Sequence, residues 1–514
     1  MKGARPLLLS MLVLCSGLKG LGAVYTVNLL TDTGSGSGNS GDLRYCITQA
    51  NTNPGADEIG FAVTGTIALN SGLPNISDSL FINGIYSGIT VDGQNHSGTT
   101  VFRVNSGPGV TVTIIGLSVV RGNGNNPDGG GILLRGGASL NLINVTVDHC
   151  TTLAESGGGI VASASSLNIA GSRITNNHLT APGGSGAGIF VEGGTLAMRD
   201  TTVSGNSLMN STDIGGAGIE LFSVSLARIE NSTINGNVNG NYGAGIRNNM
   251  GTLRMSNVTV DGNTGGVQAG GLGNIGGNAT LRNCTISGNS VTRFGGGIYN
   301  VGNGAVLTLA NTIVAGNTSG IQAPDIFNFA TINGLGKNIV SVQITNSGTI
   351  NGADTFLNVD PQMMPLTNYG GSVWTRALAP LSPGRNIAVN AEALDTLGQP
   401  LETDARGIGF PRIIEATVDI GAFESSAVMS AYTISGRVLR GARVILGLPF
   451  VKLTDLGSGG ERVRPVNHSG HFRFPDVPSG TTVRVEATGK GRTFLPQTVT
   501  VAGDIGNLIY IPQP

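Results

Sequence analysis

The chain has 514 residues and a net charge of −1, with 11% charged and 5% aromatic residues. Its 84 glycines follow no strict three-residue period, which excludes collagen, and its apolar fraction of 39% is too high for a disordered glycine-rich linker. The near-zero net charge offers no basic surface, so we expect no nucleic-acid partner.

Residues 1–23 predict a secretory signal peptide. Lys2 and Arg5 form a basic start, an apolar run follows at 7–14, and the small residue Ala23 marks the predicted cleavage site. The run is too short to span a bilayer, and no later stretch reaches roughly 18 uninterrupted apolar residues. We therefore expect a secreted or cell-surface protein without an integral membrane span.

Residues 24–110 are predicted to form an N-terminal cap and the first coils of a solenoid. The segment DLRYCITQAN (42–51) predicts a helix with Asp42 as its N-cap. A single amphipathic helix is a suitable cover for the open end of a stack of strands. Its apolar or small residues at helical spacing are Leu43, Cys46, Ile47 and Ala50.

Residues 111–345 contain a repeat with two short signatures. The first is Thr followed by Ile or Val, two further residues and Asn, and the second is a glycine run followed by Ile or Leu. A shared period between 20 and 50 residues is typical of a solenoid. The first signature ends at Asn123, Cys150, Asn177, Asn206, Asn237, Asn263, Asn289 and Asn317, and the second ends at Ile132, Ile160, Ile189, Ile219, Ile246, Leu272 and Ile298.

Between the signatures, apolar residues alternate with polar ones, as in ASLNLINVTV at 138–147. This period of two, with many β-branched residues and with Gly and Asn at the breaks, predicts short strands. We therefore predict an all-β fold: a right-handed parallel β-helix solenoid with an N-terminal cap helix, followed by a small β-sandwich.

The two signatures divide each coil unequally. From Ile or Leu to the next Asn or Cys there are 17 to 19 residues, whereas the return arc varies from 9 to 13. Stacked strands cannot change length without losing register, but loops can. The variable loops should therefore project from one side, and the longest are 178–188 and 207–218.

The signatures themselves have a structural interpretation. Asn tolerates the left-handed backbone of a tight corner, and equivalent Asn side chains can form a hydrogen-bonded ladder. The glycines supply corners and close packing. Cys46, Cys150 and Cys284 are too widely spaced for a metal site or a disulfide framework, so we expect small buried hydrophobes.

Residues one past each Ile or Leu should form an outward-facing column. The candidate ligand-binding residues in it are Phe190, Glu220, Arg247 and Tyr299, because Glu220 and Arg247 can pair on adjacent coils and the aromatics can stack on sugar rings. The alternative to ligand binding is that Glu220 and Arg247 form an ordinary surface ion pair and that the aromatic residues are scattered around it by chance. The whole column reads Leu133, Val161, Phe190, Glu220, Arg247, Gly273 and Tyr299.

Catalysis by a carboxylate pair is not predicted. Asp148 and Asp261 share one position in the coil but lie four coils apart, roughly 19 Å at about 4.8 Å per coil. Two-carboxylate hydrolysis needs a separation of about 5–9.5 Å. We assign no catalytic residue, no metal ligand and no cofactor.

The C-terminal third changes character. Residues 346–424 are rich in Pro and Gly and contain Trp374, which suits a compact closure of the solenoid. Residues 425–431 predict a linker. Residues 432–514 read as alternating strands with Gly and Pro turns, typical of a small sandwich of about seven strands.

Several segments resemble known families of secreted bacterial parallel β-helix (pectin-lyase-like) proteins. DLR (42–44), QAN (49–51) and PGADEIGF (54–61) resemble the CSLREA-type N-terminal region, with a departure at Tyr45-Cys46. TDARGIGFPR (403–412) and VDIGAFE (418–424) are similar to the choice-of-anchor Q region. SGRV, GARVIL and GHFRFPDVPSG, within 435–480, resemble the carboxypeptidase regulatory-like module.

The resemblances imply export and surface display. We expect a binding or adhesion-type protein whose partner is a polysaccharide or a cell-surface protein. The alternative is a polysaccharide lyase or glycoside hydrolase that uses the same face of the β-helix.

Overall fold

The computed structural model describes residues 22–511 apart from gaps at 126–128, 154–155, 210–214, 239–240, 322–323, 343, 426–430, 440–449, 457–458, 468, 479–480, 490–493 and 502–503. The chain forms two compact units, one of Met1–Thr367 with Gly371–Glu424 and the other of Asn368–Gly370 with Ser425–Pro514. Most of the predicted signal peptide and of the linker 425–431 lies outside the described residues.

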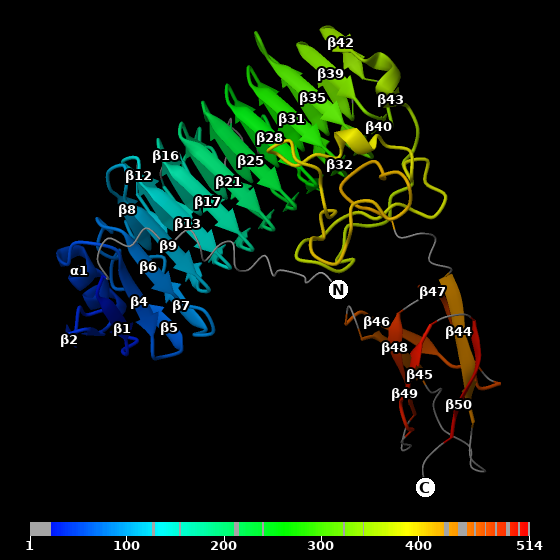
Figure 1. Cartoon of the computed structure of the whole chain (residues 1–514), viewed down its shortest axis with the longest axis horizontal. Coiled ribbons are helices and arrows are strands. Elements are labelled where there is room, and N and C mark those ends of the chain that lie inside the picture. Colours follow the sequence, from blue (N-terminus) through cyan, green and yellow to red (C-terminus); the bar gives the residue numbers. More distant parts are fainter. Residues whose placement is uncertain are drawn as a thin grey trace, which may run out of the picture. The chain divides into compact units, whose positions relative to one another are not determined.

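The first unit is a parallel β-helix built on three long sheets, and the predicted fold class is confirmed. Figure 1 shows the strands of sheet A side by side from β4 to β42. Sheet A has 15 strands: β2 (Gly36–Ser37), β3 (Ser40–Gly41), β1 (Val24–Val27), β4 (Asp57–Phe61), β6 (Leu80–Asn83), β9 (Thr111–Ile115), β13 (Ser139–Ile143), β17 (Ser166–Ala170), β21 (Thr195–Arg199), β25 (Leu226–Glu230), β28 (Thr252–Ser256), β31 (Asn278–Arg282), β35 (Val306–Ala310), β39 (Thr331–Leu335) and β42 (Thr349–Asn351).

Sheets B and C complete each coil, and short strands of sheet D precede the variable loops. Sheet B comprises β5 (Gly65–Ala68), β7 (Ile89–Asp92), β10 (Ser118–Val120), β14 (Thr146–Asp148), β18 (Arg173–Thr175), β22 (Thr202–Ser204), β26 (Thr233–Asn235), β29 (Thr259–Asp261), β32 (Thr285–Ser287), β36 (Ile313–Ala315), β40 (Asn338–Val340) and β43 (Phe356–Leu357). Sheet C comprises β8 (Phe102–Asn105), β12 (Ile132–Arg135), β16 (Ile160–Ser163), β20 (Ile189–Glu192), β24 (Ile219–Phe222), β27 (Ile246–Asn249), β30 (Leu272–Ile275), β34 (Ile298–Val301), β38 (Ile326–Asn328) and β41 (Thr345–Asn346). Sheet D comprises β11 (Asn123–Gly124), β15 (Thr151–Thr152), β19 (His178–Leu179) and β23 (Ser207–Leu208), and β33 (Ser290–Val291) pairs with β37 (Thr318–Ser319).

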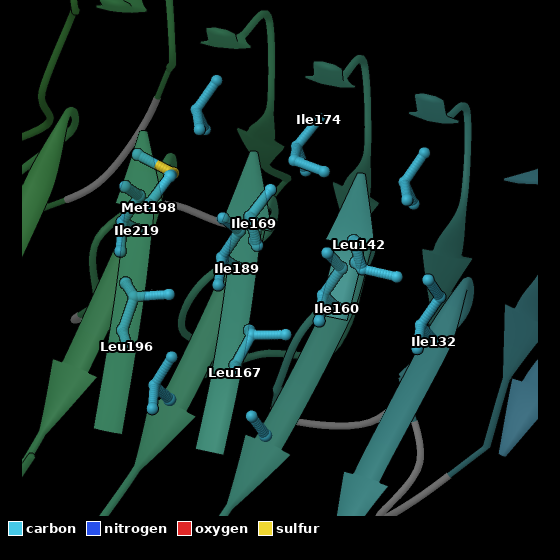
Figure 2. Packing of buried hydrophobic residues seen from close by; sticks show 14 of the residues in the cluster. Ile132, Leu142, Ile160, Leu167, Ile169, Ile174, Ile189, Leu196, Met198 and Ile219 are labelled. Carbon is cyan, nitrogen blue, oxygen red and sulfur yellow. The ribbon is translucent and has the colours of Figure 1, made fainter. Parts of the chain in front are cut away.

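The core consists of columns of equivalent residues. Ile132, Ile160, Ile189 and Ile219 pair in register along sheet C and are fully buried. Figure 2 shows this column facing the side chains of sheet A, such as Leu167. The strands of the fixed arc therefore stay in register because each slip would carry a whole buried column out of the core.

The glycine run before each Ile of sheet C is required by close packing of neighbouring coils. A Cβ atom on Gly245 would lie 2.6 Å from the carbonyl oxygen of Gly271, and one on Gly271 would lie 2.6 Å from that of Gly297. No side chain fits at this distance. The runs are therefore scaffold, as predicted.

The predicted Asn ladder is present and buried. The backbone N–H and the side-chain amide of Asn237 both donate to Oδ1 of Asn263, at 3.0 and 2.9 Å, and Asn263 repeats both bonds to Asn289. The ladder ends at Asp325, whose Oδ1 accepts from the Asn317 amide at 3.0 Å. A carboxylate suits this end because it only accepts hydrogen bonds.

Two details of the predicted corner are wrong. The left-handed residue is the one before the ladder Asn, such as Asn176 (φ 52°) or Gly205 (φ 66°), because the ladder Asn must hold its side chain toward the next coil. Asn123 pairs with Thr151 on sheet D and so lies one residue beyond the ladder, which begins at Cys150.

The N-terminal helix is confirmed as a cap. Helix α1 (Leu43–Thr52) begins after Asp42, whose side chain accepts from the backbone N–H of Tyr45 at 2.8 Å. Its apolar face joins the same hydrophobic core as the coils. The residues of that face that are buried are Leu43, Cys46, Ile47 and Ala50.

The segment after the last coil packs along sheet B and the neighbouring part of sheet A. Thr396 accepts at its backbone oxygen from Arg254, Arg376 binds Asp261, and Asn311 donates to the backbone oxygen of Val389. Trp374 in this segment is half exposed. The core of the closure is a separate hydrophobic cluster: Ile313, Ala315, Ile339, Leu378, Ala388, Ala393, Val418 and Ile420.

The second unit has two sheets around one hydrophobic cluster that includes Ile434, Phe474 and Val485. In its described part, three strands form one sheet and four form the other. The predicted small β-sandwich is confirmed. The strands are β47 (His471–Pro478), β44 (Ala431–Val438) and β50 (Ile505–Tyr510), then β46 (Glu461–Pro465), β45 (Phe450–Asp455), β48 (Thr482–Thr488) and β49 (Gln497–Thr500).

Among the described residues, no helix has the length and apolar character needed to cross a membrane. Cys46, Cys150 and Cys284 are free, and all three are buried as predicted. Burial raises the pKa of Cys150 and of Cys284 to about 12, so these thiols are inert.

Candidate binding face

The predicted column lies in register on sheet C. Successive strands pair Phe190 with Glu220, Glu220 with Arg247, Arg247 with Gly273, and Gly273 with Tyr299. The loops of unequal length between the coils do not disturb this register. The sequence therefore placed the four candidate residues on one face correctly, and their role in ligand binding stays a prediction.

Glu220 and Arg247 form an ion pair, but the pair is covered. Arg247 Nη1 lies 3.2 Å from Glu220 Oε1, and the side chains are only 12% and 1% exposed. The backbone N–H of Gly216 donates to Glu220 Oε2 at 2.8 Å. The prediction that this part of the column faces solvent is wrong, because the glycine run before β24 turns back onto the carboxylate.

Burial dominates the acidity of Glu220. Desolvation raises its pKa to about 7, although the charge of Arg247 and the Gly216 hydrogen bond act in the opposite direction. An exposed carboxyl paired with an arginine would instead have a lowered pKa. Glu220 is therefore a structural group, and it has almost no exposed surface with which to contact a ligand.

Phe190 and Tyr299 are not brought together. Both are partly buried, and four coils separate them, roughly 19 Å at about 4.8 Å per coil. A single small ligand does not reach both. Only an extended ligand that runs along the solenoid would touch the two ends of the predicted column.

Tyr299 belongs instead to a group of aromatic residues, which we call the aromatic ledge: Phe294, Tyr299, Phe327 and Phe329. Phe327 stacks with Phe294 at 4.7 Å and with Tyr299 at 5.5 Å between ring centroids. Phe329 lies 4.8 Å from Phe327 and is 53% exposed. Because Phe327 is itself buried, the ledge is a packed aromatic surface rather than a set of separate rings.

Cationic groups lie beside this part of sheet C. The guanidinium of Arg293 lies 5.5 Å from the ring centroid of Phe294, and that of Arg247 lies 5.8 Å from the ring centroid of Tyr242. Arg293 is exposed. These distances are within the range of cation–π attraction, so the arginines also hold the rings in place.

Sequence reasoning missed Phe294, Phe327 and Phe329. Phe327 follows Tyr299 in the same register, but the last coil replaces its glycine run with Pro324-Asp325, which hid it. Extending the column by one coil would have found it. Phe294 lies in the variable arc, whose conformation carries no sequence period.

The two longest loops pack against each other. Leu179 and Ala187 of the first loop form a small buried cluster with Leu208 and Ala217 of the second. Residues 210–214 of the loop 207–218 lie outside the described residues. Part of the described apolar surface of these loops is therefore buried between them and does not face solvent.

The two aspartates considered for catalysis are both engaged in local contacts. Asp261 binds Arg376 at 2.5 Å and Ser287 at 2.6 Å, while Asp148 accepts from Thr175 at 2.6 Å. The paired registers confirm that they occupy one position four coils apart. They are structural acceptors and not a hydrolytic pair.

A concave feature lies at the corner between sheets B and D. It is a shallow pocket of about 420 Å³, which we call the histidine pocket. His149 Nδ1 lies 2.5 Å from Asp148 Oδ2, and His178 Nδ1 lies 2.7 Å from Ser207 Oγ. The pocket is lined by Asn95, Arg121, His149, Thr151, His178, Thr180 and Met209.

The charges around the histidine pocket are largely compensated. Arg121 donates to the buried carboxylate of Asp92 through Nε at 2.9 Å. Desolvation and the neighbouring His149 lower the pKa of His178. Burial raises the pKa of Asp148, but hydrogen bonds from Thr175, His149 and Asn176 outweigh it and lower the pKa overall. Sequence reasoning did not predict this pocket, because His149 and His178 occupy different positions of the repeat.

No family model matches the chain, and no curated protein matches it. The crystal structure of pectate lyase Pel9A is similar to this chain at 13% sequence identity, with a TM-score of 0.39, over 78% of this chain and 96% of the other. That likeness concerns the parallel β-helix fold alone.

Proposed function

We propose that this is an exported or surface-displayed protein whose β-helix binds a polysaccharide through the aromatic ledge, without catalysing a reaction. The observation that carries the proposal is the packed group of rings around Tyr299. Phe329 is 53% exposed and is backed by the buried ring of Phe327, 4.8 Å away.

An aromatic surface of this kind suits a sugar ring. The C–H face of a pyranose is apolar and packs on a flat ring, while its hydroxyls stay in contact with water. The exposed guanidinium of Arg293 beside Phe294 adds a donor for a hydroxyl or a carboxylate. The groups needed for binding are therefore present, whereas the carboxylates Asp148 and Asp261 are held by local partners.

The three family resemblances support export and display. The CSLREA-type region that the first segment resembles belongs to secreted bacterial β-helix proteins, and the choice-of-anchor Q region that the second resembles is found at the ends of such helices. In this chain, Asp42 of the first segment caps α1, and Arg412 of the second is buried against Asn283 of a coil. These motif residues therefore have a structural role, which is consistent with a scaffold that presents a binding face.

The alternative is a polysaccharide lyase or a glycoside hydrolase acting on the same face. Arg247 would then be a candidate catalytic group. Release of reducing sugar, or unsaturated-uronate absorbance, over a panel of polysaccharides distinguishes the two functions. Turnover that is lost in Arg247→Ala would contradict a purely binding role.

The binding proposal is tested on a glycan array with the wild-type protein and the variants Tyr299→Ala and Phe329→Ala. We expect each variant to bind about 5- to 30-fold more weakly, because loss of a stacking ring costs about 1–2 kcal/mol. Tyr86→Ala removes a fully exposed ring near the N-terminus and serves as the control. An array without hits, or variants that bind like wild type, would contradict the proposal.

A further inference from the structure

The histidine pocket combines donor atoms from three successive coils. His149 lies at the corner before sheet D, His178 is on β19, and Met209 directly follows β23. Thr151, His178 and Ser207 pair in register along sheet D. The stacking of coils thus brings two imidazoles and a thioether to one pocket.

The hydrogen bond of His149 sets its tautomer. Its Nδ1 lies 2.5 Å from Asp148 Oδ2, and the other oxygen of that carboxylate accepts from Thr175 and Asn176. A carboxylate only accepts, so Nδ1 carries the proton. The lone pair of the neutral ring is therefore on Nε2.

Ser207 connects His178 to Met209. Its Oγ lies 3.6 Å from Met209 Sδ and 2.7 Å from His178 Nδ1. This oxygen accepts a hydrogen bond from the ring when Nδ1 carries the proton. That tautomer of His178 has its lone pair on Nε2, where a metal would bind.

This arrangement matches the surroundings of metal-ligating histidines. Such histidines commonly donate their second ring nitrogen to a carboxylate or another oxygen, which orients the ring and raises its basicity. The nearby positive charge of Arg121 is compensated by Asp92, so it does not repel a cation. The pocket therefore has oriented donors without a strong opposing charge.

The donor set selects the metal. Within the described residues, no three His, Cys, Asp or Glu side chains are grouped so as to hold a metal ion. Zinc sites commonly use three or four such ligands, and calcium and magnesium prefer oxygen. Two imidazoles with one thioether instead suit the soft Cu(I) ion. We propose that the histidine pocket binds Cu(I) through His149 Nε2, His178 Nε2 and Met209 Sδ.

The test is an anaerobic titration of the full chain with Cu(I) against a colorimetric chelator. We expect one tightly bound ion, with X-ray absorption showing two nitrogen neighbours and one sulfur neighbour. The double variant His149→Asn with His178→Thr should bind at least ~100-fold more weakly. Both replacements follow the fold, because Asn176 occupies the corresponding corner of the next coil and Thr151 pairs with His178.

Two further variants separate the donors from their supports. Met209→Leu should remove the sulfur neighbour, and Asp148→Asn should weaken Cu(I) about 10- to 100-fold while leaving the same three neighbours. His96→Ala, an exposed histidine, should bind like wild type. Absence of saturable Cu(I) binding would overturn the proposal. Binding that survives the double variant would also overturn it, because the ion would then be held by other groups, such as the three buried cysteines.

Discussion

The carboxylate of Glu220 lies 3.2 Å from the guanidinium of Arg247 on the next coil, and both side chains are covered. Burial nevertheless raises the pKa of Glu220 to about 7. A folded-state pKa above the unfolded value means that the native state binds this proton more tightly. The contribution of Glu220 to stability therefore falls as the pH rises from about 5 to about 7, and is constant above that range.

Glu220→Gln should remove this pH dependence. Gly216 and Arg247 donate to different oxygens of Glu220, so the single amide oxygen of glutamine replaces one of these acceptors, and the side chain does not ionise. Relative to wild type, the free energy of unfolding of the variant should rise by roughly 1.4 kcal/mol per pH unit between about pH 5 and 7. Denaturant unfolding of both proteins at several pH values measures this difference in the free energy of unfolding. Glu192→Gln, exposed on the neighbouring coil, should show no such trend, and parallel curves for Glu220→Gln and wild type would contradict the prediction.

The Asn ladder should not tolerate a carboxylate in its middle. Asn263 donates to Asn289 Oδ1 at 2.9 Å and to the backbone oxygen of Ile234 at 3.0 Å. Asn263→Asp removes the donor and buries a charge opposite two acceptors, so the free energy of unfolding should fall by about 3 kcal/mol or more. Asn278→Asp, at an exposed position of β31, is the matched control and should change it by about 0.5 kcal/mol at most.

The closure depends on a buried arginine. Arg412 Nη2 donates to Asn283 Oδ1 at 3.2 Å and to the backbone oxygens of Asp419 and Gly421, and the side chain is fully buried. Arg412→Leu removes the donor of these three oxygens and the cation that lies 3.9 Å from the buried Glu424 carboxyl, so we expect the free energy of unfolding to fall by about 3–5 kcal/mol.

Limited proteolysis within 353–424 and denaturant unfolding together measure the effect of Arg412→Leu. Arg412→Lys should recover only part of the loss, because an ammonium does not reproduce the fork of donors. Arg199→Ala breaks an exposed ion pair with Asp200 and should cost no more than about 1 kcal/mol. Equal effects of the Arg412 and Arg199 variants would show that the closure does not rely on this residue.

The three buried thiols report on global unfolding. Burial raises the pKa of Cys46 to about 11 and that of Cys284 to about 12, so at pH 8 these thiols are protonated as well as covered. In a Cys15→Ser background, a disulfide reagent should modify almost no thiol in the native protein and three after denaturation. Rapid native labelling of any one thiol would indicate that its coil opens locally.

Much of the solenoid is determined by the sequence because its signals are local and repeated. The period of the signatures, the alternation in 138–147 and the helical spacing after Asp42 each reflect a periodic backbone geometry. The same repeat placed Phe190, Glu220, Arg247 and Tyr299 in one register, since equivalent residues of parallel coils must stack.

The tertiary structure alone decided the surroundings of those residues. The covering of Glu220 depends on how the chain at Gly216 turns back. The aromatic ledge gathers Phe294 and Phe327 from different arcs, and His178 and Met209 line one pocket from adjacent coils. These environments come from irregular segments that carry no period. Burial, pKa and donor geometry depend on such neighbours, so they follow from packing and not from the repeat.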